Sequence, residues 1–423
     1  MTVKEHPKLA VIGQGYVGLP LAMRAVDAGY DVVGIDFDRA RIEMLAGGES
    51  YVDDVTGDTL RAALGTGRYA ATAEYAPAAG FDFAVITVPT PLRDARPDLS
   101  YIESATRSLA PLLTPGATVV LESTTYPGTT QELMVPLLEE LSGLRAGVDF
   151  FAGYSPERID PGNRRFTFQT TPKIVSGIDA ASLERVDGLF SDLVDTTVPV
   201  GSPREAEMAK LLENTFRHVN VALVNELAIY ANELGVNVWE TIEAAATKPF
   251  GFMKFTPGPG VGGHCLPIDP SYLSWKVKTD LGRDFRFVDL ANDVNEHMPE
   301  YVVQRAMHVL NDHRKSLRGS KVLVLGVAYK RDSSDARESP ALEVIRLLNE
   351  YGAEVTGVDS HVEDRRWPAG AAREELTAEL VDEVDLVILI TDHSDIDTGL
   401  LENAATPVFD TRNKLSGENV TRL

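Results

Sequence analysis

The sequence contains a single cysteine, Cys265, in a chain of 423 residues. One thiol cannot form an intramolecular disulfide, so a disulfide-stabilised scaffold is excluded and the thiol is available for chemistry. Long apolar runs are also missing, because none reaches the roughly 18 residues that a membrane helix needs, and the N-terminus does not resemble a signal peptide. We therefore expect a cytoplasmic protein that does not enter a membrane.

Positive charge is scarce as well. The chain has 40 Lys and Arg against 63 Asp and Glu, which gives a net charge of -23. Such a surface repels a nucleic-acid backbone, so we expect no nucleic-acid partner. A small anionic substrate is still compatible if a few basic side chains converge on one pocket. Hydrophobic residues make up 44% of the chain, enough for two or three globular domains.

The N-terminal segment predicts a βαβ unit. An apolar strand over 9–12 precedes a glycine turn, a helix extends to about Ala28, and a second strand over 31–35 ends at an aspartate. Further apolar runs at 83–89 and 117–124 alternate with helical stretches. This alternation is typical of a parallel sheet that is covered on both faces.

A long helix is predicted from about residue 203. Ser202 and Glu205 have the spacing of a capping box, Pro203 suits the first helical position, and Gly235 suits the end of the helix. A helix of this length could form a spine between two domains.

The C-terminal region repeats the N-terminal pattern in outline, since YGAEVTGVD mirrors AGYDVVGID. Its turn differs, because Ala328 replaces the second glycine and Lys330 follows, which suggests a different phosphate ligand. We predict an α/β protein with two Rossmann-like, doubly wound parallel-sheet domains, 1–200 and 301–423. A central helical region, 201–300, would join them.

Gly13, Gly15 and Gly18 form a GxGxxG motif directly after the first strand. The first glycine permits a tight turn, the second lets the backbone approach a pyrophosphate, and the third lets helix and strand pack closely. Asp36 at the end of the second strand could bind a ribose 2′-hydroxyl and would repel a 2′-phosphate, which favours NAD over NADP. The alternatives are a flavin or nucleotide domain without redox chemistry, or a structural glycine turn.

Cys265 follows the run GPGVGGH, which suits neither a regular helix nor a central strand. We expect it on a loop whose missing side chains leave room for a ligand, although a lone cysteine is often a buried apolar residue. His264 is either structural or a proton carrier. Asp269 either caps the following helix or acts as an active-site acid.

Lys210, Asn214 and Arg217 share one face of the predicted long helix. They form either a solvated polar stripe or a site that stabilises an oxyanion. With a hydride acceptor, a thiol suggests a specific chemistry: the thiolate adds to an aldehyde, the thiohemiacetal loses a second hydride, and water hydrolyses the thioester. An alcohol would become an acid.

Nine ordered segments carry a resemblance to a known family: GQGYVGLP, TVPTP, STTYPGT, SPERIDPGN, AEMAKLLENTFRHVNVALVNELA, PGPGVGGHC, NDVNEHMPEYV, LGVAYKRDSSDARESPA and FDTRN. With these segments the chain resembles the UDP-glucose/GDP-mannose dehydrogenase family of nucleotide-sugar 6-dehydrogenases nearly end to end. The resemblance implies NAD-dependent, four-electron oxidation of a sugar C6 hydroxyl, a central dimerisation region and a homodimer. It also implies a C-terminal domain that binds the nucleotide diphosphate, and no metal.

The resemblance assigns roles to individual residues. Cys265 would be the nucleophile, Lys210 and Asn214 would stabilise oxyanions, with the lysine also a candidate base, and Asp269, Glu157 and Thr124 would handle proton transfer and the hydrolytic water. The cofactor set would be Gly13, Gly15, Tyr16, Val17, Gly18, Asp36, Arg41, Thr90 and Thr124. The substrate set would be Glu157, Arg158, Lys210, Asn214, Arg217, Gly262, Lys330 and Arg412.

Some positions depart from relatives that act on UDP-glucose, which tend to read GGSCFPKD at the thiol. Here His264 replaces the serine, Ile268 the lysine, and Pro161 a second glutamate, while Lys248 and Lys254 stand near the place of an expected arginine. These variants resemble the branch that oxidises UDP-N-acetylglucosamine or UDP-N-acetylmannosamine, with a lean to the gluco epimer. The alternatives are a UDP- or dTDP-glucose 6-dehydrogenase, a two-electron hydroxyacid-type dehydrogenase and a non-catalytic nucleotide-sugar sensor.

Overall fold

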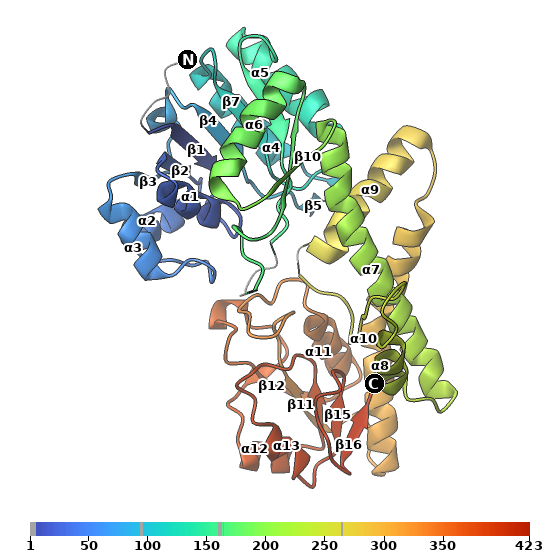
Figure 1. Ribbon diagram of the computed structural model, residues 1–423. Coiled ribbons are helices and arrows are strands. Elements are labelled where there is room, and N and C mark those ends of the chain that lie inside the picture. Colours follow the sequence, from blue (N-terminus) through green and yellow to red (C-terminus); the bar gives the residue numbers. More distant parts are fainter. Residues whose placement is uncertain (1–5, 94–95, 160–162, 164, 264) are drawn as a thin grey trace. The chain divides into compact units, whose positions relative to one another are not determined.

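The computed structural model describes residues 6–93, 96–159, 163, 165–263 and 265–423, with the backbone alone at Cys265 and Pro267. His264 and Pro161, which entered the sequence comparison, lie outside the described residues. The chain divides into two compact units, Met1–Glu213 and Asn214–Leu423 (Figure 1).

Unit 1 is built on an eight-stranded sheet with the order β10-β9-β8-β7-β4-β1-β2-β3. Its strands are β1 (Lys8–Ile12), β2 (Asp31–Ile35), β3 (Tyr69–Thr72), β4 (Phe83–Ile86), β7 (Thr118–Leu121), β8 (Phe151–Tyr154), β9 (Lys173–Gly177) and β10 (Thr197–Pro199). The strands pair in parallel except β8 and β9, which are antiparallel. The prediction of a parallel sheet is therefore confirmed with one antiparallel exception.

Helices cover both faces of this sheet, as Figure 1 shows. They are α1 (Gly18–Asp27), α2 (Arg39–Ala46), α3 (Gly57–Gly65), α4 (Ser100–Leu109), α5 (Val135–Ser142) and α6 (Ala180–Leu193). Short helical turns are η1 (Ala76–Ala78), η2 (Ala110–Leu112) and η3 (Thr130–Met134), and β5 (Leu92–Arg93) pairs with β6 (Arg96–Pro97) as a separate hairpin.

Alternate residues of β1 enter two different cores. Leu9 and Val11 pack in one hydrophobic cluster, and Ala10 and Ile12 pack in another. Because successive strand side chains point to opposite faces, the near-continuous apolar sequence of β1 is the signature of a sheet buried on both sides. This arrangement confirms the doubly wound expectation for unit 1.

The long helix α7 (Pro203–Glu233) begins in unit 1 and continues into unit 2. Ser202 Oγ contacts the Glu205 carboxylate and accepts a hydrogen bond from the Arg204 amide at 3.3 Å. The predicted start is thus confirmed. Unit 2 continues with α8 (Val238–Ala246), α9 (Cys265–Leu281) and α10 (Arg286–Asp312).

The second sheet has six strands in the order β13-β12-β11-β14-β15-β16, all paired in parallel. The strands are β11 (Lys321–Leu325), β12 (Glu354–Val358), β13 (Ala372–Arg373), β14 (Leu386–Leu389), β15 (Val408–Asp410) and β16 (Val420–Arg422). The helices are α11 (Pro340–Glu350), η4 (Asp364–Arg366), α12 (Ala378–Glu383) and α13 (Thr398–Glu402). Residues of β11 again alternate between two cores.

One expectation about the thiol is wrong. Cys265 does not lie on a loop but is the first residue of α9. Asp269 consequently lies inside α9 and is not its N-terminal cap. None of the described helices combines the length and the apolar character that are needed to cross a membrane.

Candidate active site

The GxGxxG turn has the geometry that the motif predicts. Gly13 has a φ of +98°, and an added Cβ would lie 2.7 Å from the Thr87 carbonyl oxygen. A Cβ on Gly18 would lie 1.9 Å from the Gly13 carbonyl oxygen, so helix and strand require a glycine there. A Cβ on Gly15 would meet nothing within 4 Å. The turn therefore leaves open space at the one glycine whose expected role is to admit a pyrophosphate.

Asp36 is buried at the end of β2 beside this turn. Its Oδ2 accepts a hydrogen bond from the Gln14 amide at 2.9 Å, and its Oδ1 accepts one from the Asp38 amide at 3.0 Å. The Arg41 guanidinium lies 3.6 Å from Asp36 Oδ2. Gln14, which was not selected from the sequence, helps to hold the turn. Its side-chain oxygen accepts a hydrogen bond from the Tyr69 hydroxyl at 2.8 Å.

Replacing Asp36 with serine should shift the preference from NAD towards NADP by at least about tenfold, the size of one charge-assisted hydrogen bond. The change removes the acceptor for a ribose hydroxyl and frees the Arg41 guanidinium to bind a 2′-phosphate. The ratio of kcat/KM for the two cofactors measures the effect. An unchanged ratio would contradict the placement of the ribose at Asp36, and Asp38→Ser is the matched control.

The other cofactor candidates lie on neighbouring elements. Tyr16 and Val17 precede α1, Thr90 is buried after β4, and Thr124 follows β7. Strands β1, β4 and β7 are neighbours and parallel, so the segments after them meet at one edge of the sheet. In open α/β sheets this carboxyl edge is where ligands bind.

Glu157, after β8, is held by several groups of unit 1. Its Oε1 accepts hydrogen bonds from the Arg158 and Ile159 amides, each at 2.5 Å, and its backbone carbonyl accepts from Lys210 Nζ at 2.6 Å. Burial works against ionisation, but the positive charges of Lys173 and Lys210 keep the pKa of Glu157 below its usual value. The structure thus brings two predicted catalytic residues, Glu157 and Lys210, into contact.

Two residues near Glu157 were missed from the sequence. Lys173 Nζ contacts the Glu122 carboxylate and lies 3.2 Å from Glu157 Oε2. Their positions in the sequence gave no signal, since Lys173 and Glu122 are 51 residues apart. Arg158, a predicted substrate residue, is engaged by Glu213 at 2.6 Å.

In unit 2, Asn214 and Asp269 form a buried pair. Asn214 Nδ2 donates to Asp269 Oδ2 at 2.5 Å, and both residues are at most 5% exposed. Asp269 lies one turn after Cys265 on α9. The expected polar face of α7 is only partly present, because Lys210 and Asn214 are buried whereas Arg217 is exposed.

The glycines before Cys265 make room for protein side chains. A Cβ on Gly262 or Gly263 would lie 2.7 Å from atoms of the Tyr329 side chain, and one on Gly258 would lie 2.8 Å from the Arg412 guanidinium. The Gly258 amide donates to the buried Asn225 Oδ1 at 2.9 Å. The expectation that the missing side chains leave room for a ligand is therefore wrong at these three glycines.

Lys330 and Arg412, the candidate nucleotide-binding residues, follow β11 and β15 at the carboxyl edge of the second sheet. Arg412 Nε donates to the Ile390 carbonyl at 2.6 Å, and burial lowers the pKa of its guanidinium against the opposing charges of Asp392 and Asp410. A partly desolvated cation of this kind suits a phosphate or diphosphate.

Two aspartates and two histidines cluster near the same edge. Asp332, His361, His393 and Asp395 place ligand atoms within 4.8 Å of one another. However, His393 accepts from the Asp332 amide at 3.0 Å and bonds Asp359 at 2.9 Å with its other ring nitrogen, and its ring stacks on His361. Two stacked rings do not converge their in-plane lone pairs on one ion, so we assign no metal to this group.

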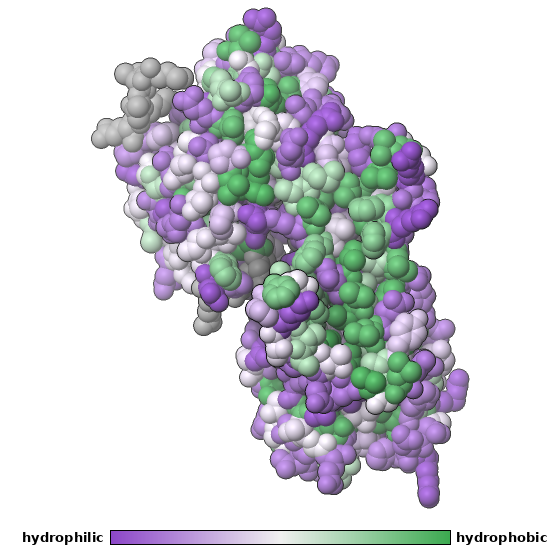
Figure 2. Space-filling view, turned by 45° about the vertical axis from the view of Figure 1, so that its right-hand side comes forward, coloured by the Kyte–Doolittle hydropathy of each residue, from purple (hydrophilic) through white to green (hydrophobic). Residues whose placement is uncertain are grey.

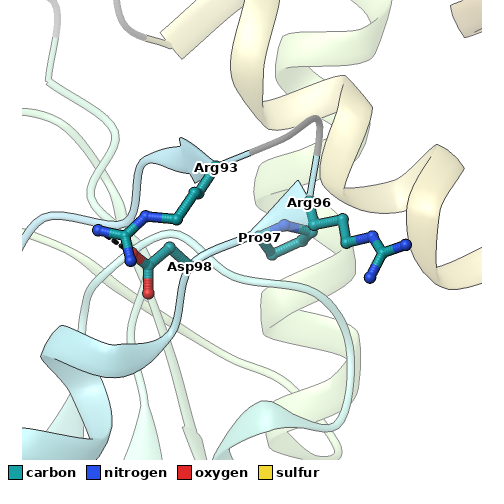
Figure 3. Close-up of a pocket in the computed structure, with 4 residues that line it drawn as sticks. All are labelled: Arg93, Arg96, Pro97 and Asp98. Carbon is teal, nitrogen blue, oxygen red and sulfur yellow. Dashed lines mark ion pairs between the residues drawn. The ribbon is translucent and has the colours of Figure 1, made fainter.

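A hollow of about 460 Å³ lies at the β5–β6 hairpin and is lined by Arg93, Arg96, Pro97 and Asp98. Figure 3 shows that Arg93 turns toward Asp98 whereas Arg96 points away. Because the two guanidinium groups do not converge, the hollow has no arrangement for an anion, and we place the site at the sheet edges instead.

Comparison with known proteins identifies the family. The NAD binding domain, the central domain and the UDP binding domain of the UDP-glucose/GDP-mannose dehydrogenase family match residues 7–194, 204–297 and 323–417. The chain belongs to this family. The predicted family, the α/β fold, the NAD cofactor and an NAD-dependent oxidoreductase acting on nucleotide sugars are thereby confirmed.

Individual relatives agree with this assignment. The chain is 36% identical to a UDP-N-acetyl-D-mannosamine dehydrogenase of Pyrococcus horikoshii over 91% of this chain and 89% of that protein. It is 37% identical to a UDP-N-acetyl-D-glucosamine 6-dehydrogenase of Pseudomonas aeruginosa over 84% and 83% of the two chains. A solved structure of the Pyrococcus horikoshii UDP-D-ManNAc dehydrogenase superposes with a TM-score of 0.89 and 34% identity, covering 98% of both chains.

Proposed function

We propose that the protein oxidises the C6 hydroxyl of a nucleotide sugar to a carboxylate with two molecules of NAD, through a thioester on Cys265. The observation that carries this proposal is that Cys265 opens α9 one turn ahead of Asp269, whose carboxylate is held by Asn214 at 2.5 Å. A nucleophile followed by an oriented acid and amide suits acyl chemistry.

The reaction balances as two oxidations and one hydrolysis. The alcohol loses a hydride and a proton to become an aldehyde, and the Cys265 thiolate adds to the aldehyde carbon. The thiohemiacetal loses the second hydride to become a thioester, and water releases the acid and the thiol. NAD supplies the hydride acceptor in both oxidations.

The residues of the chain supply binding, charge and proton transfer. Lys210 and Asn214 stabilise the oxyanions, and the buried Lys210 also serves as a base for the hydroxyl. Glu157, with Thr124 and Asp269, positions the hydrolytic water and takes its proton. The proposed cofactor and substrate residues are the two sets given in the sequence analysis, and the proposed domain division is 1–200, 201–300 and 301–423, supported by the three family domains.

The proposed substrate is a UDP-N-acetylhexosamine. Relatives that are 36% and 37% identical carry the names of UDP-N-acetylmannosamine and UDP-N-acetylglucosamine dehydrogenases, which supports the acetamido group for either epimer. Lys254, near the place of the arginine expected for UDP-glucose, already pairs with Glu243. A UDP- or dTDP-glucose substrate is the second candidate.

A substrate panel with NADH counting tests the proposal. UDP- and dTDP-hexoses with and without the acetamido group are each incubated with excess NAD, and NADH is measured per sugar consumed. We expect two NADH per sugar, with the highest kcat/KM for a UDP-N-acetylhexosamine. One NADH per sugar would indicate a two-electron dehydrogenase, and no NADH with any sugar would indicate a sensor.

We also propose a homodimer formed through the helical part of unit 2, and the cytoplasm as the compartment in which NAD and a reduced thiol are available. Figure 2 shows hydrophobic surface along the part of unit 2 that carries α7. The exposed apolar side chains of these helices in unit 2 include Phe216, Leu223, Leu227 and Tyr230 of α7, and Phe287 and Leu290 of α10. Contiguous exposed apolar surface marks association sites. A sedimentation mass of one chain would contradict the dimer.

A further inference from the structure

Inside unit 1, Lys173 lies between two glutamates that come from different strands. Its ammonium contacts Glu122 Oε1 and lies 3.2 Å from Glu157 Oε2. Lys173 is 3% exposed and Glu122 is 1% exposed. Glu122 Oε2 is buried and has no hydrogen-bond partner among the described residues. Because Glu157 belongs to the proposed site, its contact with Lys173 bears on the reaction as well as on stability.

The antiparallel strand of unit 1 explains how the lysine reaches this place. Glu122 and Glu157 follow β7 and β8, so both lie at the carboxyl edge of the sheet. Lys173 is the first residue of β9, and β9 runs antiparallel to β8. The beginning of β9 therefore lies beside the carboxyl end of β8, which a parallel strand would not allow.

Burial and mutual charge shift the pKa values of Glu122, Lys173 and Glu157. Burial raises the pKa of Glu122 to about 8, against the opposing charge of Lys173 and with the support of the Glu157 charge. Burial also works against the ammonium of Lys173, yet the charges of Glu122 and Glu157 raise its pKa. The Lys173 ammonium thus faces two carboxyl groups that both interact with its charge.

We propose that Lys173 is a positioning residue for Glu157, orienting its carboxylate and keeping it ionised, while Glu122 holds the Lys173 ammonium in place. This inference rests on the proposed role of Glu157 in the hydrolytic half of the reaction. Two amides donate to Glu157 Oε1 and Lys173 contacts Oε2, so both oxygens of the carboxylate are held in place.

The charged groups around Glu157 come from four parts of unit 1. Lys173 on β9 and Lys210 on α7 favour its ionised form, and Glu122 after β7 contacts the Lys173 ammonium. The neighbouring Arg158 guanidinium is engaged by Glu213 at 2.6 Å. Lys173 is therefore the cation that contacts the carboxylate itself, whereas Lys210 contacts the backbone carbonyl.

Lys173→Met should shift the acid limb of the pH profile of kcat to higher pH by about 1–3 units. This is the effect of removing one close opposite charge from a carboxylate. Without the ammonium, burial raises the pKa of Glu157. As the pH falls, Glu157 therefore becomes protonated, and stops acting as a base, at a higher pH than in the wild type. The measurement is kcat against pH, together with the pre-steady-state rate of NADH formation. We expect slower hydrolysis with little change in the rate of the first NADH, a split that a general loss of folding does not produce.

Two further variants keep the test decisive. Lys173→Arg restores the positive charge, and its acid limb should return to within about 0.5 pH units of the wild type. Lys8→Met removes a lysine whose ammonium donates to the Pro77 and Ala79 carbonyls at the opposite edge of the sheet, and should not move the limb. If Lys173→Met does not fold, the double variant Glu122→Gln/Lys173→Met removes two of the three buried ionisable groups and should show the same shift.

Glu122→Gln tests the raised pKa of Glu122 without using activity. The folded pKa, about 8, lies above that of the unfolded chain, so the native state loses stability as pH rises from about 5 to about 8. A glutamine has no proton to lose. The melting temperature of Glu122→Gln should therefore rise relative to that of the wild type over this interval, and a constant difference would show that the pKa of Glu122 is not raised.

The inference and the proposed function fail differently. If the wild type yields two NADH per sugar but Lys173→Met keeps the wild-type acid limb, the positioning role is overturned and the proposed function stands. If the wild type yields no more than one NADH per sugar, the hydrolytic step itself is absent and the proposed function falls first.

Discussion

Glu157→Gln is expected to lower steady-state turnover by about 10²–10⁴-fold while leaving the formation of NADH in the first turnover nearly unchanged. The amide keeps the size of the side chain but cannot accept a proton from water. Two NADH per active site should form in a burst, after which the rate follows the slow hydrolysis of the thioester. Stopped-flow absorbance of NADH separates the burst from the steady state.

The control for this variant is a glutamate outside the site. Glu74→Gln removes an exposed carboxylate that pairs with Arg39 at 3.3 Å, and it should behave as the wild type. If Glu157→Gln lowered the burst and the steady state by the same factor, Glu157 would act before the thioester forms. That result would contradict its role in hydrolysis.

Cys265→Ser is expected to lower turnover by at least about a thousandfold, because a hydroxyl is far less ionised than a thiol and is a poorer leaving group. The variant should stop after the first oxidation or hold a slowly hydrolysed ester. Steady-state NADH production with the best sugar of the panel measures the loss.

The loss of turnover is informative only if Cys265→Ser still binds NAD. The glycine turn and Asp36 lie in unit 1, so NAD affinity measured by calorimetry should stay within about threefold of the wild type, less than one lost hydrogen bond would cause. Turnover of Cys265→Ser within tenfold of the wild type would make the thiol dispensable. Alkylation of the Cys265 thiol in the wild type should likewise abolish activity.

Local patterns predicted the cofactor half of the protein well. The strand over 31–35 is observed at those residues, and the turn places Gly13, Gly15 and Gly18 as the motif requires. These features depend on contacts between residues close in sequence and on the alternation of apolar side chains, which a sequence displays directly. The resemblance to a known family supplied the roles of Glu157 and Thr124, which spacing alone did not.

The start of α9 could not be read in the same way. Glycines and prolines around Cys265 indicated a loop, yet Pro267 lies in the first turn of α9, where the backbone amides have no acceptor inside the helix. Proline is tolerated there, so composition misplaced the boundary. The glycines were misread for a related reason, because Tyr329 and Arg412, which fill the space beside them, come from distant parts of the chain.

Lys173 illustrates what no local pattern contains. Its two partners are 51 and 16 residues away, and the contact depends on β9 running antiparallel to β8. The alternation of strands and helices in the sequence predicts a parallel sheet, in which the start of this strand would lie far from the site. A buried charge is recognised only once the fold shows that it is buried and what it faces.

The central claim is that the sugar carbon becomes bonded to the sulfur of Cys265. The most direct measurement is the intact mass of Glu157→Gln, quenched in acid during turnover with NAD and the preferred nucleotide sugar, followed by peptide mapping. We expect the chain to gain the mass of the substrate acyl group on the peptide that contains Cys265, and hydroxylamine to remove it. A chain whose mass never changes, in a variant that still forms NADH in a burst, would contradict the account.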